Sequence, residues 1–587
     1  MIPCRMIPRR RANTPTRRQK RPSKHRKAGQ AMTEAPLGAP RDRIAMAVAW
    51  IAGTALWRRA LYATGSGAAA AFAFAPFYLL PAFVLAWSSL VLMLDEAAAS
   101  QRPRARAFAT GWFFGFGFHL VGLHWFAFAF LVQAELFAWM APFAVVGMAA
   151  FLGLFFGAAA ALANSFRQAG VRRILVLAAA MAAAEFLRGH ILTGLPWNLP
   201  AQAMAGLAVT AQPVAWLGPY GYSLLVLVVA MLPAAFADGA PSFAGDRVAK
   251  LAAKKAGGLV LGATAAAFLY LGIVAIGWAR LAFTPEPAPT KALVRIVQPN
   301  IPQREKINPD LWDRNIKTAI DLSVGGEKPA GQQRFILWPE NAAPLLDEDE
   351  AALRAIGERF DQGDVLVAGA VRRGMDESGR WRVFNSILMV AVDGNAQPGR
   401  LTDYYDKHHL VPFGEYLPMQ PLLKALGLSQ LAPFDEGFTP GSGPARIELG
   451  GPAFAPLICY EAIFPNELYP RGERPDWLMT ATNDAWFGDA AGPRQHLDQA
   501  RFRSIETGLP MARAANTGIS VLIDAKGRYL GRVDPYERGV IDAPLPGALP
   551  ATVYARTGDW PAIALMVLTF LFGALKWRES APAAPGN

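Results

Sequence analysis

Long apolar stretches fill the first half of the chain and return once near its end. A helix that crosses a bilayer needs about 20 mostly apolar residues. Eight stretches come close to that length, the fifth being short, and each is predicted to be a membrane span. A further stretch, residues 44–57, has only about 14 residues and predicts an interfacial helix or an extension of the first span. The eight predicted spans are residues 60–77, 78–94, 107–132, 136–162, 174–186, 205–235, 257–279 and 560–575.

Basic residues follow the second, fourth, sixth and eighth of these stretches. Because Lys and Arg beside membrane spans favour the cytoplasmic side, both chain ends are predicted to be cytoplasmic, and residues from about 281 to 559 to lie outside. A ninth span at residues 44–57 would strand the basic clusters on the wrong face. The clusters are Arg102, Arg104 and Arg106; Arg167, Arg172 and Arg173; Arg247, Lys250, Lys254 and Lys255; and Lys576 and Arg578.

Much of the excess positive charge lies between Arg5 and Lys27, where no acidic residue occurs. A basic tail is typical of a nucleic-acid-binding arm or of the cytoplasmic end of a membrane protein. The apolar stretches that follow favour the second, so no nucleic-acid partner is expected. Cys4 and Cys459 are the two cysteines of the chain, and that number and spacing predict neither a structural disulfide nor a zinc site.

In the second half, apolar runs of strand length alternate with helical stretches, which predicts a layered α/β domain. Asp393-Gly394 is typical of a hairpin turn. The predicted strands are residues 292–298, 334–338, 364–371, 386–392, 454–458, 476–482 and 519–523, and the predicted helices are residues 310–323, 348–360, 461–469 and 495–514.

Three reactive residues, Glu340, Lys407 and Cys459, each follow an apolar run. Taken singly, each has a plainer interpretation: a charge at a helix start, a solvated surface amine and an inert buried thiol. Brought together by a fold, they make a base, a cation that stabilises an oxyanion and a nucleophile, which is acyl-transfer chemistry. In such a site Glu415 could anchor the Lys407 ammonium, and the backbone N–H of Tyr460 could donate to the oxyanion.

These segments resemble the nitrilase superfamily and, within it, the bacterial apolipoprotein N-acyltransferases. The resemblance implies an α-β-β-α sandwich in which Glu340 is the general base, Lys407 the oxyanion-stabilising lysine and Cys459 the nucleophile. The supporting residues it implies are Glu415, Tyr460 and Glu461. It extends over the whole chain after the basic tail, and the motifs that carry it are residues 185–189, 193–197, 297–303, 335–340, 404–418, 458–461, 483–488 and 558–560.

One residue departs from the family pattern, and the role of one charged pair stays open. Ile307 stands where the family usually has a Trp in a mobile loop near the site, with Trp312 nearby. Glu185 and Arg188 fall at the outer end of a predicted span, where they either pair with each other or contact lipid headgroups.

The resemblance implies ping-pong acyl transfer in the bacterial inner membrane by a monomer that needs no cofactor. An acyl chain passes from a membrane phospholipid to Cys459 as a thioester. It then passes to the α-amino group of the N-terminal S-diacylglyceryl cysteine of a lipoprotein, the last step of lipoprotein maturation. Because both substrates carry lipid chains, we expect an apolar arm that gates access from the membrane, the alternative being ordinary core packing. The candidate residues of this lipid-access arm are Leu417, Leu422, Leu423, Leu426, Trp486 and Phe487.

The predicted organisation is a multi-pass α-helical membrane domain joined to a nitrilase-like catalytic domain. Two other functions stay open. A membrane-anchored amidase or nitrile hydrolase would use the same triad with water as acceptor, although it would not need so many spans. A transporter or lipid-binding protein would place more charged residues within its spans. The predicted segments are a basic cytoplasmic tail at 1–43, the membrane domain at 44–281, the periplasmic catalytic domain at 282–558, the last span at 559–577 and a cytoplasmic tail at 578–587.

Overall fold

A computed structural model describes residues 56–166, 168–237, 246–375, 379–394, 397–418 and 437–575. Several predictions fall outside these residues. They are the basic tail at 1–43 with Cys4, nearly all of the apolar stretch 44–57, the arm residues Leu422, Leu423 and Leu426, and the C-terminal tail at 578–587.

Each of the eight predicted spans falls on a helix in the described part of the chain. The apolar sequences form these helices because a helix satisfies its own backbone hydrogen bonds, which a bilayer requires. The helices are α2 (Leu56–Ala71), α3 (Leu80–Ala98), α4 (Pro103–Gly122), α6 (Ala141–Asn164), α7 (Gly170–His190), α9 (Val214–Ala235), α10 (Asp246–Phe283) and α17 (Trp560–Ala574).

Several of these helices depart from the predicted bounds; α2, for example, ends at Ala71 and not at residue 77, and α10 begins at Asp246 and not at residue 257. Two other departures arise where the helix is interrupted. The third span does not run straight to residue 132, because α4 ends at Gly122 and the 3-10 helix η1 (His124–Leu131) continues at an angle of 47°. The sixth does not begin at residue 205. A 3-10 helix η3 (Pro200–Met204) and a short α8 (Ala208–Ala211) come first, and α9 starts only after Pro213, which has no N–H to continue a helix.

Fewer than eight of the described helices are both long enough and apolar enough to count as membrane spans. Among the described residues, four helical stretches are long and apolar enough, or five if the bent pair of α4 and η1 counts as one. Helices α2 and α17 have only 16 and 15 residues, and α7 carries an acidic residue and several arginines. The number of crossings therefore stays a prediction. The four stretches are Leu80–Ala98, Ala134–Asn164, Val214–Ala235 and Gly257–Phe283.

The second half of the described chain is built around two sheets. The larger has the strand order β11-β1-β2-β3-β4-β5 and the smaller the order β10-β9-β8-β7-β6. Strands β1, β2 and β3 run parallel, as do β6, β7 and β8. The strands are β1 (Leu293–Gln298), β2 (Arg334–Trp338), β3 (Asp364–Met375), β4 (Trp381–Ala391), β5 (Arg400–Asp406), β6 (Phe454–Ile458), β7 (Trp477–Thr482), β8 (Met511–Ala515), β9 (Ser520–Ile523), β10 (Tyr529–Val533) and β11 (Gly539–Pro544).

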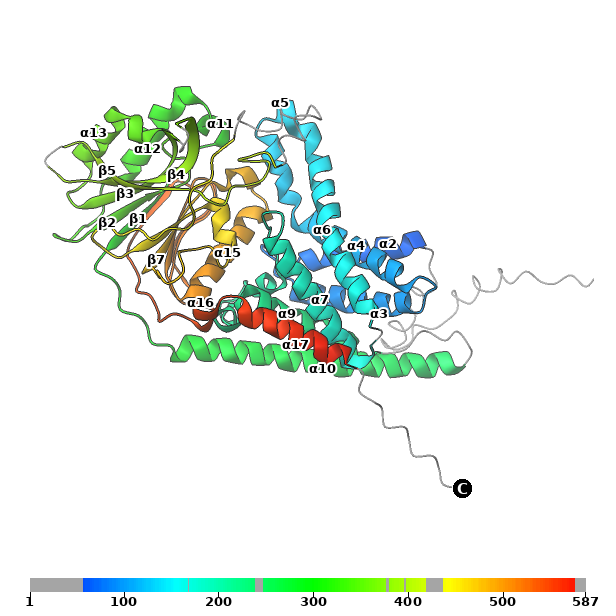
Figure 1. Ribbon diagram of the computed structural model, residues 1–587. Coiled ribbons are helices and arrows are strands. Elements are labelled where there is room, and N and C mark those ends of the chain that lie inside the picture. Colours follow the sequence, from blue (N-terminus) through cyan, green and yellow to red (C-terminus); the bar gives the residue numbers. More distant parts are fainter. Residues whose placement is uncertain are drawn as a thin grey trace, which may run out of the picture.

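The two sheets face each other and are covered by helices on their outer faces, which confirms the predicted α-β-β-α sandwich. Side chains from both sheets, such as Ile296 and Met479, share one core. Helices α12 (Trp312–Ser323) and α13 (Glu350–Arg359) cover the larger sheet, and α15 (Ala491–Thr507) covers the smaller one. In Figure 1 the sheets lie on one side of the molecule, the apolar helices on the other, and α15 between them.

Two predicted helices of this half are wrong in extent. The helix predicted at 495–514 ends at Thr507, because Gly508 takes a left-handed conformation and residues 511–515 form the central strand β8. The helix predicted at 461–469 is only the 3-10 helix η7 (Cys459–Ile463), followed by irregular chain through Pro465. Strand β5 was not predicted, because its side chains are mostly polar and little buried, and the sequence has no apolar run there.

Candidate active site

Glu340, Lys407 and Cys459 each lie just beyond the end of a strand, and the two sheets bring those ends together. Glu340 follows β2 by two residues, Lys407 directly follows β5, and Cys459 directly follows β6. All three side chains are buried, with Lys407 only 1% exposed. Neighbouring backbone segments pack closely here, because a Cβ added to Gly369 of β3 would lie 2.5 Å from the Glu340 Cα. The structure thus gathers three residues that the sequence separates by more than 50 positions at each step.

Lys407 is held between two carboxylates. Its Nζ lies 2.9 Å from Glu415 Oε2 and 3.6 Å from Glu340 Oε1. Burial alone would lower the pKa of Lys407, but the carboxylates of Glu415 and Glu340 outweigh burial and raise that pKa above its usual value. Lys407 is therefore a fixed ammonium, which is the state that oxyanion stabilisation requires.

Asn385 of β4 ties the two carboxylates to each other. Its Nδ2 donates to Glu340 Oε1 at 2.8 Å and to Glu415 Oε1 at 2.7 Å. Glu415 also accepts from the Val411 N–H at 2.7 Å. Burial raises the pKa of Glu415, and the Lys407 ammonium opposes that rise. The amide and the ammonium together keep two buried carboxyl groups in one small volume.

Cys459 is the first residue of η7, and its backbone has a φ of +48°, in the left-handed region that side-chain-bearing residues rarely adopt. Burial and the Glu340 carboxylate raise the pKa of the Cys459 thiol, while the Lys407 ammonium and a hydrogen bond with Thr482 lower it. The balance favours a neutral thiol at rest. A thiolate would form only as a base removes the proton, and the charge of the Glu340 carboxylate acts on this thiol.

Glu461 joins the strand end that carries Lys407 to the turn that carries Cys459. Its carboxylate accepts from the N–H of Ile458 at 2.7 Å, from the N–H of His408 at 2.8 Å and from the Tyr405 hydroxyl at 2.8 Å. Burial would raise the pKa of Glu461, but the bond with the His408 ring outweighs it and lowers that pKa. A buried carboxylate with this many donors fixes the backbone on both sides of the site.

The site borders the loop that follows α7 in the helical half. The Tyr460 hydroxyl donates to the Gly194 carbonyl oxygen at 2.8 Å. The His409 ring bonds the Thr193 carbonyl oxygen at 2.8 Å through Nε2. Arg188 donates to the carbonyl oxygens of Leu195 and Trp197. The turn that carries Cys459 is thereby attached to the apolar helices.

Glu185 and Arg188 pair with each other, and both are 2% exposed. This is the pairing alternative of the two that the sequence left open. In the observed arrangement Arg188 orders the loop beneath Tyr460, and its charge is not presented to the surroundings.

The candidate lipid-access arm is only partly described. Leu417 is buried, Trp486 is 38% exposed, and the Phe487 ring packs at 4.6 Å from the Trp125 ring. Phe487 also lies 5.9 Å from the Trp197 ring. It therefore belongs to the junction between the two halves, and a gating role for the arm stays a prediction.

Comparisons with known proteins match most of the chain. A family model of the apolipoprotein N-acyltransferase N-terminal domain matches residues 66–232, and a carbon-nitrogen hydrolase model matches residues 293–551. An apolipoprotein N-acyltransferase of Rhodopseudomonas palustris is 39% identical over 531 residues, which cover 89% of this chain and 96% of the relative. The chain belongs to the apolipoprotein N-acyltransferase family.

A second relative agrees with that membership, and a solved structure is similar to part of the chain. An apolipoprotein N-acyltransferase of Bradyrhizobium diazoefficiens is 39% identical, with 88% of this chain and 94% of the relative covered. A CN-hydrolase superfamily protein from Xanthomonas campestris is 18% identical at a TM-score of 0.29, covering 47% of this chain and 97% of the other. Family membership and the apolar helices together indicate a membrane protein.

At the position where the family usually has a Trp, Ile307 is 41% exposed. It follows the short helix α11 (Gln303–Lys306), and Trp312 donates its indole N–H to the Lys306 carbonyl oxygen at 3.2 Å. Lys306 itself is buried and donates to the Glu340 carbonyl oxygen. Burial lowers the pKa of Lys306 to about 8, against the pull of the Glu340 carboxylate. The segment thus brings a second cation to the site.

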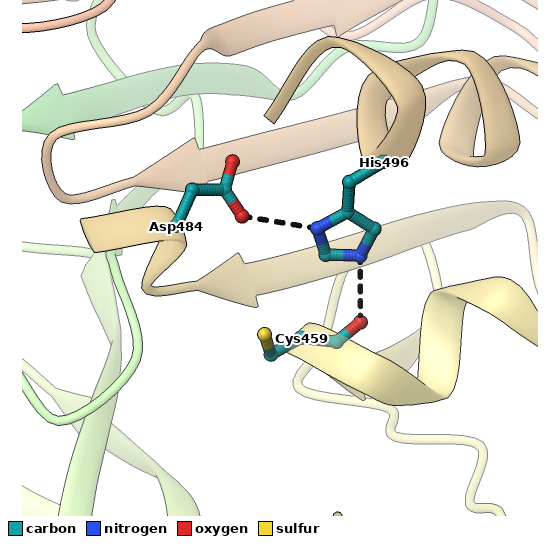
Figure 2. Close-up of side chains that lie close together, drawn as sticks. All are labelled: Cys459, Asp484 and His496. Carbon is teal, nitrogen blue, oxygen red and sulfur yellow. Dashed lines mark hydrogen bonds and ion pairs between the residues drawn. The ribbon is translucent and has the colours of Figure 1, made fainter. Parts of the chain in front are cut away.

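Asp484 and His496 lie behind Cys459, as Figure 2 shows. One ligand atom from each of the three residues lies within 4.8 Å of the others, a set that could hold a metal ion. The contacts do not fit one. Both His496 ring nitrogens already have close partners, and the Arg513 guanidinium lies 2.7 Å from Asp484 and would repel a cation. The absence of a metal from the reaction stays a prediction.

Three residues of the site were not among those predicted from the sequence. Asn385 lies within an apolar strand, Lys306 follows a proline-containing loop, and His496 lies on α15, which is buried on nearly all sides. A polar residue inside an otherwise apolar run is the signal that points to Asn385. Neither Lys306 nor His496 stands out by such a pattern, because their partners lie far away in the chain.

Proposed function

We propose that this chain transfers an acyl chain from a membrane phospholipid to the α-amino group of the N-terminal S-diacylglyceryl cysteine of lipoproteins. Glu340 is the general base, Lys407 the oxyanion stabiliser and Cys459 the nucleophile. The observation that carries this proposal is the buried set of thiol, ammonium and carboxylate beside a loop of the apolar helices. Membership of the family supplies the substrates.

In the first half-reaction, Glu340 takes the proton from Cys459 Sγ as the sulfur attacks an ester carbonyl of the phospholipid. The carbonyl oxygen becomes an oxyanion, which the Lys407 ammonium and the Tyr460 N–H stabilise. When the carbon–oxygen bond breaks, the glycerol oxygen leaves with the proton held by Glu340. The products are a thioester on Cys459 and a lyso-phospholipid.

In the second half-reaction, the neutral α-amine of the lipoprotein attacks the thioester carbonyl. Glu340 takes a proton from the nitrogen, and the same two donors stabilise the second oxyanion. The carbon–sulfur bond breaks, the sulfur regains a proton, and the amide leaves. Water must be kept from the thioester between the two steps, which is consistent with the burial of Cys459.

The proposal includes a location and a topology. The chain lies in the bacterial inner membrane and crosses it eight times, with both ends cytoplasmic and residues 282–558 periplasmic. The catalytic domain then meets the outer leaflet, where both lipid substrates are found. The enzyme acts as a monomer without a cofactor.

The test is acyl transfer by the purified full-length protein in detergent micelles. With a phospholipid labelled in its acyl chains and a synthetic diacylated lipopeptide, we expect the label on the lipopeptide amine. Cys459→Ala and Lys407→Met should abolish it, and lipopeptide with a blocked amine should not react. Labelled free fatty acid and ammonia release from simple amides, without lipopeptide product, would instead indicate a hydrolase. Full activity in Cys459→Ala would contradict the proposal.

A further inference from the structure

The peptide bond between Cys459 and Tyr460 is held by a residue that no step of the proposed reaction uses. His496 Nε2 lies 3.1 Å from the Cys459 carbonyl oxygen. Because that oxygen can only accept, Nε2 is the nitrogen that carries a proton. Figure 2 shows the ring facing this carbonyl oxygen, with the sulfur on the other side of the residue.

Fixing this carbonyl oxygen also fixes the Tyr460 N–H. A trans peptide unit is planar, so its C=O and its N–H point in opposite directions. The Tyr460 N–H belongs to the first turn of η7, where a helical N–H has no acceptor within its own helix. The direction of the Tyr460 N–H is therefore set by the group that donates a hydrogen bond to the Cys459 carbonyl oxygen.

The His496 ring is itself held from behind. Its Nδ1 lies 3.0 Å from Asp484 Oδ1 and 3.1 Å from Arg513 Nη2. Arg513 Nη2 also donates to Asp484 Oδ2 at 2.7 Å, and the Thr482 hydroxyl donates to Asp484 Oδ1 at 2.9 Å. These side chains are almost completely buried. The ring cannot turn without breaking several buried polar contacts, each of which is costly to leave unmade.

The backbone needs such support at this position. Cys459 has its φ at +48°, and the left-handed conformation costs a residue with a side chain roughly 1–2 kcal/mol. Such a conformation persists where surrounding contacts impose it. The hydrogen bond from His496 acts on the carbonyl of that same residue.

We propose that His496 is a positioning residue that aims the Tyr460 N–H at the oxyanion by gripping the Cys459 carbonyl, with Asp484 and Arg513 locking its ring. The inference rests on the proposed function, because it assigns the Tyr460 N–H to the oxyanion. His496 does not serve as the base, since its protonated nitrogen faces the carbonyl and its other nitrogen faces Asp484 and Arg513.

Two substitutions separate this role from simple packing. In His496→Gln the side-chain amide can take the place of Nε2 and still donate to the Cys459 carbonyl. In His496→Asn the shorter amide can take the place of Nδ1 only, so the grip is lost. A matched control is His119→Asn, a buried histidine of α4 whose Nδ1 bonds the Gly115 carbonyl oxygen.

The readouts are two reactions of Cys459 in the purified full-length protein. Acylation by p-nitrophenyl butyrate passes through an oxyanion, whereas alkylation by iodoacetamide does not. We expect His496→Asn to slow acylation by about 10²-fold, the typical effect of losing one oxyanion donor. The acylation rate of His496→Gln should stay within about 10-fold of the wild-type rate. The acylation rate of His119→Asn should equal the wild-type rate. Alkylation should change little in any variant.

Each other outcome overturns a specific claim. Equal acylation losses in His496→Asn and His496→Gln, or alkylation falling in parallel with acylation, would show that His496 only supports packing. Unchanged acylation in His496→Asn would show that it does not aim the donor. Wild-type protein that is alkylated but never acylated at Cys459 would overturn the proposed function, and this inference with it.

Discussion

At the scale of single residues, the site holds several charged groups in a small buried volume. Two carboxylates, Glu340 and Glu415, lie within reach of one ammonium, and Asn385 donates one hydrogen bond to each. Buried carboxylates repel each other unless hydrogen bonds or cations compensate. The uncharged amide of Asn385 is therefore as necessary to the arrangement as the residues that react.

The substitution Asn385→Asp tests this reasoning, because it keeps the shape and replaces two donated hydrogen bonds by a third negative charge. The repulsion favours the protonated form of Glu340, so the acidic limb of the pH–rate profile should move to higher pH. At pH 7 acyl transfer should fall by at least about 10²-fold, the usual range for general base catalysis. The measurement is the initial rate of lipopeptide acylation from pH 5 to pH 9. An unchanged acidic limb would remove Asn385 from the account.

Glu340 and Cys459 could be singled out from sequence because they follow the buried strands β2 and β6. Lys407 follows the mostly polar strand β5, so the expected apolar run is absent there, and only the resemblance to the family marked that residue. Asn385, Lys306 and His496 could not be assigned a role. Their partners are the Glu340 carboxylate, the Glu340 carbonyl oxygen and the Cys459 carbonyl oxygen, and a single sequence does not tell which distant groups meet.

At the scale of elements, several buried strands were predicted well, whereas the buried central strand β8 was missed and the end of α15 was misplaced. Strands β2 and β6 have the predicted bounds, because a short run of mostly apolar residues is typical of a strand buried on both faces. The helix predicted at 495–514 overran its end, since Met511–Ala515 continues the same mixed composition. What ends the helix is the conformation of Gly508, with a φ of +69°.

Gly508→Ala should therefore destabilise the catalytic half. An alanine in the left-handed region costs about 1–2 kcal/mol, and its Cβ would also lie 3.1 Å from the Pro550 carbonyl oxygen. We expect the melting temperature in detergent to fall by a few degrees, at about 2–4 °C per kcal/mol for a domain of roughly this size.

The control is Gly147→Ala on α6, where an added Cβ meets no atom within 4 Å. Because alanine is the better helix former, this variant should melt at or slightly above the wild-type temperature. Equal destabilisation by both substitutions would mean that Gly508 does not end α15 through its conformation.

At the scale of the whole molecule, α15 joins the sandwich to the apolar helices. Gln495 Oε1 accepts from the Trp125 and Trp197 indoles at 3.2 and 2.8 Å. The Tyr78 hydroxyl donates to Asp498 Oδ2 at 2.8 Å. Helix α15 is buried on nearly every side, so it has no single apolar stripe. A helix buried all round gives no periodic signal of what covers each face, and this junction could not be predicted from the sequence.

Asp498 makes this junction sensitive to pH. Burial raises the pKa of Asp498 from 3.8 to about 7, while the hydrogen bond from Tyr78 and the charge of Arg501 oppose the rise. The folded protein thus holds a proton that the unfolded chain has released above about pH 4. Its stabilising effect is fully present below about pH 4 and is lost as the pH rises through about 7.

Asp498→Asn removes this titration and keeps a neutral side chain. The melting temperature of the variant minus that of wild type should therefore increase as the pH rises from 4 to 8. The rise of the Asp498 pKa from 3.8 to about 7 corresponds to a few kcal/mol of stability at most, at about 1.4 kcal/mol for each tenfold change in proton affinity. A difference that stays constant across this range would show that Asp498 does not titrate at the junction.

The central claim is that Cys459 carries the acyl chain between the two lipid substrates. Its most direct test is to incubate the full-length protein with labelled phospholipid alone and map the label by peptide mass spectrometry. We predict one acyl chain on Cys459, released by neutral hydroxylamine as a thioester and discharged when diacylated lipopeptide is added. A label that is equally abundant in Cys459→Ala, or lipopeptide acylation with no acyl-enzyme on the path, would contradict the account.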